Sequence, residues 1–220
     1  MGWLAKYGDQ PLSLIVLLFI LSLLPLIVVI GTSFLKISIV LSLLRNALGI
    51  QQVPPNMAIY GMALILTMFI MAPVGYQINN NVKASPFTLE DEHIFERVDN
   101  QMLAPWRQFM MQHTQKKQIA FFSQTATQLW PENLRQQIPS DSIFVILPAF
   151  MVSQLVEAFK IGLLLYLPFI AIDLIVSNIL LAMGMMMVSP MTISLPFKIM
   201  VFILVGGWER LLTQLILSYK

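Results

Sequence analysis

The chain has 220 residues, of which 57% are hydrophobic and 11% are charged, and its mean hydropathy is +0.77. Soluble domains carry a charge on about a quarter of their residues, so this composition excludes an ordinary soluble protein. The formal net charge of +2, with no basic cluster, argues against a nucleic-acid partner. The lack of Cys excludes disulfides, thiol nucleophiles and thiolate metal ligands.

The first segment, residues 1–78, is predicted to be a pair of membrane helices. A helix that crosses a bilayer needs about 20 mostly apolar residues, and the uncharged runs 12–30 and 57–78 each approach that length. Pro54 and Pro55 come just before the second run and predict a rigid entry to that helix.

The connection between these two runs bears on orientation. It carries Lys36 and Arg45 and no acidic residue, so the positive-inside rule favours a cytoplasmic connection. Two spans then place residues 79–142 on the periplasmic side. Lys6, before the first run, argues for the opposite orientation.

The middle segment, residues 79–142, is predicted to be a small polar helical domain inserted between two apolar halves. It holds more than half of the charged residues, but also several Phe and Trp side chains, which argue against disorder. Residues 90–102 have helical spacing, and Ala104-Pro105 is expected to break that helix. Residues 115–129 are predicted to form a second helix that ends before Pro131.

The last segment, residues 143–220, is apolar but interrupted by charges and prolines. The run from Ser142 to Met183 spans about 42 residues and as a helix would be about 60 Å long. The hydrocarbon core of a bilayer is only about 30 Å thick. We therefore expect a long helical hairpin with its tip at residues 184–190, which packs into an oligomer and faces protein or water over much of its length.

Four charged residues interrupt the apolar helices of this segment: Glu157, Lys160, Asp173 and Lys198. A charge that faces lipid at the bilayer centre costs at least about 2.5 kcal/mol, so each needs a reason to be there. One interpretation is an ion or proton relay, as in a secondary transporter. The other, which we favour, is ion pairing between helices or subunits that holds an assembly together, with Glu157 and Lys160 also close enough to neutralise each other in part.

No catalytic motif is found. The two histidines, His93 and His113, are 20 residues apart and lack an HExxH pattern, and the chain has no nucleophile elbow, P-loop or dinucleotide-binding glycine motif. The acidic run 90–92 is typical of a solvated face. We therefore predict a protein that is not an enzyme and that has no cofactor and no metal site.

A cluster of methionines marks the expected hairpin tip: Met183, Met185, Met186 and Met187. Methionine side chains are flexible and polarizable, and they adapt to irregular partners. If several copies of the chain pointed these methionines into one central channel, the side chains would form a deformable apolar seal. Spacing alone, however, favours ordinary apolar filling over this seal.

Several ungapped motifs resemble the two signatures of the FliP/SctR family of type III secretion proteins. The first signature is matched by residues 31–36, 44–56 and 72–73. The second is matched by residues 148–153, 158–159, 172–173, 183–190 and 195–198. The resemblance covers nearly the whole chain, and the phrase at residues 175–182 is more similar to the virulence injectisome branch than to the flagellar branch.

The resemblance implies a function that composition does not. Family members assemble as homo-oligomers, a pentamer in the family, with two smaller export-apparatus membrane proteins. The product is a helical, cone-shaped export gate at the bacterial inner membrane, much of it raised to the periplasmic side. Unfolded protein substrates pass through its centre. In the family the methionine tip is a gasket, which maps onto Met185, Met186 and Met187 with Met183 adjacent, so the resemblance reverses the preference for ordinary filling.

Two positions depart from the family pattern. Many relatives have Glu where this chain has Gln154, and pair it with the residue equivalent to Lys198. Here that bridge cannot be ionic, and Glu157, one helical turn later, is the expected substitute. Many relatives also have Asp where this chain has Gly206.

Overall fold

The computed structural model describes residues 11–50, 53–84, 103–132 and 142–220, and within these ranges it contains helices and no strand. The all-α prediction is therefore confirmed for the described residues. The helix predicted at residues 90–102 lies outside them. The helices are α2 (Pro11–Gly31), α3 (Phe34–Leu48), α4 (Asn56–Ala84), α6 (Ala104–Gln112), α7 (Lys116–Leu129), α9 (Ile143–Ala182), α10 (Pro190–Leu204) and α11 (Gly207–Leu217).

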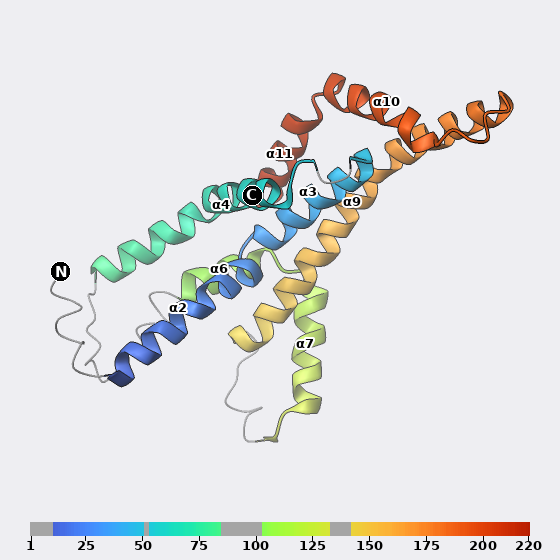
Figure 1. Ribbon diagram of the computed structural model, residues 1–220. Helices are drawn as coiled ribbons and strands as arrows, with labels where there is room; N and C mark the ends of the chain where they lie inside the picture. The colour runs from blue at the N-terminus through green and yellow to red at the C-terminus, as the bar shows by residue number, and fades with distance from the viewer. Residues whose placement is uncertain (1–10, 51–52, 85–102, 133–141) are drawn as a thin grey trace.

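The long helix α9 is the axis of the molecule (Figure 1). It has 40 residues and continues through Pro148 and Pro168, which corresponds to a length of about 60 Å. Its N-terminus is capped by the side chain of Ser142, which accepts a hydrogen bond from the backbone N–H of Phe144. The prediction of one overlong helix is confirmed.

Helix α10 folds back along α9, and the turn between them is where the sequence predicted a hairpin tip. Gly184 has φ of +73°, and the backbone N–H of Met185 bonds to the carbonyl of Leu180. This geometry is a Schellman motif, which ends a helix with a residue in the left-handed conformation that glycine adopts without strain. After α10, the chain bends by 61° into α11.

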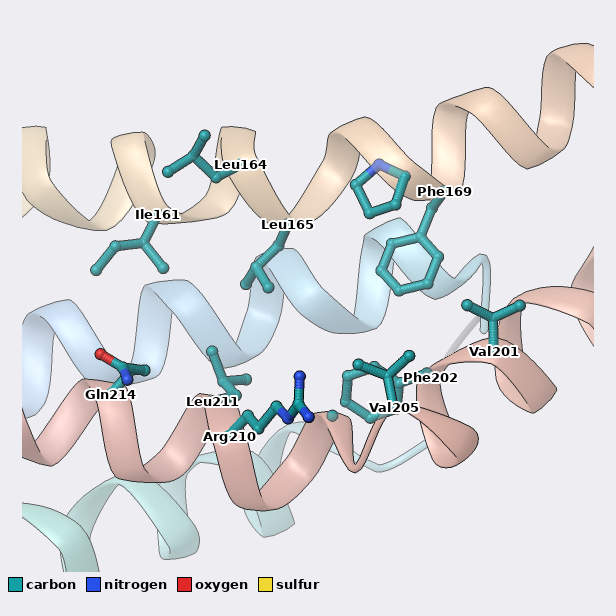
Figure 2. Close-up of a pocket in the computed structure, with 12 residues that line it drawn as sticks. Ile161, Leu164, Leu165, Phe169, Val201, Phe202, Val205, Arg210, Leu211 and Gln214 are labelled. Carbon is teal, nitrogen blue, oxygen red and sulfur yellow. The ribbon is translucent and has the colours of Figure 1, made fainter.

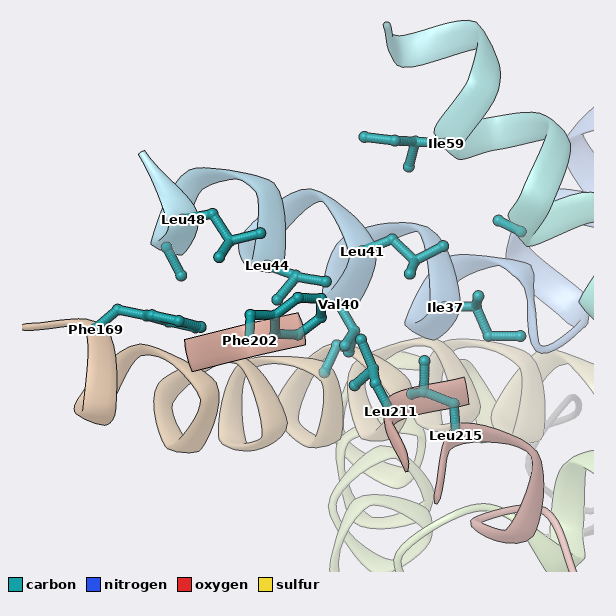
Figure 3. Packing of buried hydrophobic residues seen from close by; sticks show 13 residues of the cluster. Ile37, Val40, Leu41, Leu44, Leu48, Ile59, Phe169, Phe202, Leu211 and Leu215 are labelled. Atoms are coloured by element: carbon teal, nitrogen blue, oxygen red, sulfur yellow. The ribbon is translucent and has the colours of Figure 1, made fainter. Parts of the chain in front are cut away.

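Most of the segment predicted to connect the first two apolar runs is a buried helix, α3. Figure 3 shows side chains of α3 packed against residues of α9, α10 and α11. The buried apolar residues of α3 are Ile37, Val40, Leu41, Leu44, Ala47 and Leu48. Their spacing of three and four residues is that of one helix face, and it could have identified the helix from the sequence.

Close approach between α3 and α9 depends on a glycine of α9. A Cβ atom built on Gly162 would lie 2.2 Å from Cδ1 of Leu43 on α3. A side chain here would require Leu43 to move, so the glycine favours this close packing, which places the charged residues of α3 and α9 within reach of each other.

Helices α6 and α7 come from the polar segment and pack against α9. The helix predicted at residues 115–129 is confirmed as α7. Ala104-Pro105 begins α6, which agrees with the preference of proline for the first helical turn; the helix that it was predicted to break lies outside the described residues. The indole N–H of Trp106 donates to the carbonyl of Gly31 over 2.6 Å, connecting α6 to the end of α2.

Helices α4 and α9 are long and apolar enough to cross a bilayer. Two bent pairs, Pro25–Gly31 with Phe34–Leu48 and Pro190–Leu204 with Gly207–Leu217, would raise the number of spans among the described residues to four if each pair crosses as one unit. Many large apolar side chains on α4, α9 and α10 are exposed. Soluble monomers rarely expose such contiguous apolar surface, so lipid or other protein chains cover it.

Candidate functional site: two buried ion pairs and a methionine tip

The first ion pair joins α3 to α9. The Nζ atom of Lys36, a residue only 1% exposed, lies 2.6 Å from Oε2 of Glu157 and 4.5 Å from the centre of the Tyr219 ring. A lysine is buried so completely only when its charge is compensated. Lys160, predicted to lie close enough to neutralise Glu157 in part, is exposed and forms no ion pair with any residue in the described ranges.

The position of Lys36 also weakens the argument, made from the sequence, for the orientation of the chain in the membrane. The positive-inside rule counts basic residues of loops that face the cytoplasm, whereas Lys36 is buried within a helix and paired with an acid. Its charge is therefore no indicator of the side on which this part of the chain lies.

The second ion pair joins α9 to α10. The Nζ atom of Lys198, a residue 3% exposed, lies 2.6 Å from Oδ2 of Asp173 and 3.4 Å from the carbonyl oxygen of Ala47 at the end of α3. The hydroxyl of Ser194 donates to Oδ1 of Asp173 over 2.5 Å. The prediction that Glu157 takes the place of the family's glutamate as the partner of Lys198 is therefore wrong, because Lys198 pairs with Asp173.

Gln154 has a different role from the one its family position suggested. Its buried amide donates from Nε2 to the carbonyl of His113 over 2.9 Å, and its Oε1 accepts a hydrogen bond from the Tyr219 hydroxyl over 2.5 Å. A carboxylate could accept from Tyr219 but could not donate to His113. The glutamine thus connects α9 both to the α6–α7 turn and to the C-terminal end of the chain.

Aromatic rings surround this connection. The ring of Tyr219 stacks on Phe109 with centroids 6.0 Å apart and contacts His113 at 5.1 Å. Burial lowers the pKa of His113 and nearby Lys36 lowers it further, so the imidazole stays neutral at pH 7. Burial, with a contribution from Glu157, raises the pKa of Tyr219, which keeps its hydroxyl proton available to Gln154. Sequence reasoning did not identify Tyr219, because a single tyrosine at a chain end carries no pattern.

Replacing Tyr219 with Phe is expected to destabilise the protein by about 1–2 kcal/mol. The change removes one hydrogen bond and leaves the buried carbonyl of Gln154 without its donor. Thermal unfolding of the purified protein in mild detergent measures the effect. Tyr76→Phe is the matched control, because Tyr76 is 69% exposed; equal melting temperatures of the two variants would contradict the prediction.

The methionine tip lies at the outer end of the hairpin that α9 and α10 form (Figure 1). Met187 is 100% exposed and Met186 80% exposed, and Met183 and Met185 are exposed at 60% and 44%. The methionines therefore do not fill the core of this chain. Their side chains are free to contact another molecule.

The charged residues of α9 do not converge on one site. Glu157 and Asp173 pair with different lysines, and their separation of 16 residues corresponds to about 24 Å along the helix. A proton relay requires groups within hydrogen-bonding distance or connected by water. Among the described residues there is also no group of three His, Cys, Asp or Glu side chains that could hold a metal ion.

Comparison with known proteins identifies relatives over almost the whole chain. The sequence pattern of the FliP family matches residues 17–215. The chain is 53% identical to virulence protein YscR of Salmonella typhimurium over 217 residues, which cover 96% of this chain and 98% of that protein. It is 54% identical to Yop proteins translocation protein R of Yersinia pestis, covering 94% and 96% of the two chains. It is 44% identical to harpin secretion protein HrcR of Erwinia amylovora, covering 96% and 97%.

Proposed function

The chain belongs to the FliP family, and on that premise we propose that it is a membrane subunit of a type III secretion export apparatus that passes unfolded proteins through a central channel. The observation that carries the proposal is the match of residues 17–215 to the family. Relatives of nearly the same length are named as translocation and secretion proteins, which supports the same role here.

The assembly we propose is a homo-oligomer, with the family's pentamer as the expected number, joined by two smaller membrane proteins at the bacterial inner membrane. The exposed apolar faces of α4, α9 and α10 support it, because a single chain leaves them uncovered. The 40-residue length of α9 exceeds what a bilayer requires. That excess supports a particle that rises above the bilayer, and we place its raised part and residues 79–142 on the periplasmic side, as in the family.

Within that assembly we assign the closure of the channel to Met185, Met186 and Met187, with Met183 adjacent. Their exposure at the end of a hairpin supports this assignment. Thioether side chains are flexible enough to close around an irregular polypeptide and to seal the lumen when it is empty.

Replacing Met185, Met186 and Met187 together with Ala is expected to make the assembled apparatus leak small solutes, because shorter side chains leave an opening at the seal. The measurement is uptake of a small membrane-impermeant dye by cells that express the apparatus. Met57→Ala is the matched control, since Met57 is 82% exposed but lies on α4, away from the tip. Dye uptake equal to that of the wild type would refute the seal.

The function itself is tested by deleting the gene from its host and measuring secreted proteins in the medium. Secretion is expected to stop and to return when the gene is restored. Native mass spectrometry of the chain with its co-expressed partners provides a second test. A defined higher oligomer that includes those partners is expected, whereas a monomer or dimer that ignores them, with secretion intact, would support a secondary transporter instead.

A further inference from the structure

A cleft with a volume of about 410 Å³ lies where α10 bends into α11, on the side that faces α9 (Figure 2). This volume is within the range of about 300–1,000 Å³ that small-molecule sites occupy. The lining is apolar, with Phe169 and Phe202 among its side chains, apart from two polar residues, Arg210 and Gln214. The cleft is thus an apolar space with one positive charge.

Arg210 is exposed and forms no ion pair with any residue in the described ranges. Its sequence neighbour Glu209 is not a partner, because consecutive residues of a helix do not face each other. In Figure 2 the side chain of Arg210 extends from α11 toward the cleft. A guanidinium beside apolar surface favours an anion with oxygen atoms that accept its parallel hydrogen bonds.

We propose that this cleft binds an anionic phospholipid, with an acyl chain in the apolar space and the phosphodiester on Arg210. The bend of 61° between α10 and α11 belongs to a pair of helices that together have the length and hydropathy of a membrane span. A cleft at such a bend is open to the lipids around it. Basic groups in pockets between membrane helices are a known means of binding anionic head groups. The site does not depend on the export function proposed above.

A lipid fits this cleft better than a second copy of the chain. An occupant must bring one anion next to a long apolar group, and an anionic phospholipid contains both. On α9 of a second copy the acidic residues are Glu157 and Asp173, and both are already paired with buried lysines. Offering either one to Arg210 would leave a buried lysine uncompensated, which is strongly unfavourable. Glu209 on α11 is exposed, and its pairing with Arg210 of another copy is the alternative that the oligomer mass tests.

The test uses the full chain purified in an uncharged detergent, with phosphatidylglycerol or phosphatidylcholine of identical acyl chains added. Native mass spectrometry counts the lipids retained at each concentration. The wild type is expected to retain phosphatidylglycerol in preference. Arg210→Gln is expected to weaken that binding by about ten-fold, the usual effect of losing charge-assisted hydrogen bonds. It is expected to weaken phosphatidylcholine binding less, because the choline cation of that lipid already offsets the charge of its phosphodiester. Lys160→Gln is the matched control, because Lys160 is an exposed cation on α9 outside the cleft.

A second variant tests the apolar part of the site. Val205 lines the cleft and is 49% exposed, so Val205→Trp fills the space from its edge and is expected to reduce retention of both lipids. Equal retention of the two lipids by the wild type would overturn the proposal without any variant. It would also be overturned if Arg210→Gln left lipid binding intact but reduced the mass of the oligomer, since the occupant would then be a protein chain.

Discussion

Replacing Glu157 with Gln is expected to destabilise the protein by about 3 kcal/mol, because it leaves the charge of Lys36 buried without its carboxylate. Breaking a buried ion pair at one partner costs about 3–5 kcal/mol. The lower end applies here, since the side chain of Glu157 is 34% exposed while that of Lys36 is 2% exposed. The loss also affects the C-terminal contact, because Lys36 lies over the ring of Tyr219.

Unfolding in mixed detergent micelles, followed by circular dichroism, measures this loss. Glu132→Gln is the matched control, because Glu132 is an exposed residue of the polar segment. The double variant Lys36→Met, Glu157→Leu is expected to recover most of the stability, since apolar residues of similar size replace a buried ion pair at little cost. If Glu157→Gln were as stable as Glu132→Gln, Lys36 would have to be compensated by another group.

Replacing Asp173 with Ala is expected to release α10 from α9 near the hairpin tip. Lys198 would keep only its long contact of 3.4 Å with the carbonyl of Ala47, and Ser194 would lose the acceptor of its shorter hydrogen bond. The expected cost is about 3 kcal/mol. This loss of stability is concentrated in the hairpin. The methionine tip is therefore expected to change its orientation while the rest of the fold stays intact.

The measurement for this variant is the distance between spin labels on the two arms of the hairpin. The chain has no native cysteine, so cysteines introduced at Ile179 and Ile193 would be the only labelled positions. Both residues line the cleft between α9 and α10. The distance distribution is expected to broaden in Asp173→Ala and to stay narrow in Asn178→Ala, which removes an exposed polar side chain of the same helix. A narrow distribution in both would show that apolar packing alone holds the hairpin.

The two ion pairs also change how charge in the apolar helices is understood. We propose that they first hold this chain in the shape that assembles, and that any contact between subunits acts through that shape. Lys160 differs, because it is exposed on α9, so of the four charges it is the one placed to contact another chain directly. Charge reversal of Lys160 would then affect assembly more than the stability of the single chain.

The membrane class and the hairpin were determined by the sequence itself. Both follow from local properties: the length of the apolar run that becomes α9, the helix end at Gly184, and the start of α10 at Pro190. Chain length in a helix converts directly to distance, and glycine and proline act on the backbone at their own positions. No distant partner is needed for these features, so a single sequence was enough to predict them.

The partners of the charged residues were decided only by the tertiary structure. Lys36 and Glu157 are 121 residues apart, and Lys198 and Asp173 are 25 apart. Sequence reasoning favoured ion pairs between helices or subunits but could name only one nearby pair, Glu157 and Lys160, because spacing on one helix was the only proximity it could measure. The close approach of α3 to α9 at Gly162 brings distant side chains within 2.6 Å. Burial then makes that contact strong, because a lysine removed from water needs a counter-charge wherever in the chain it is found.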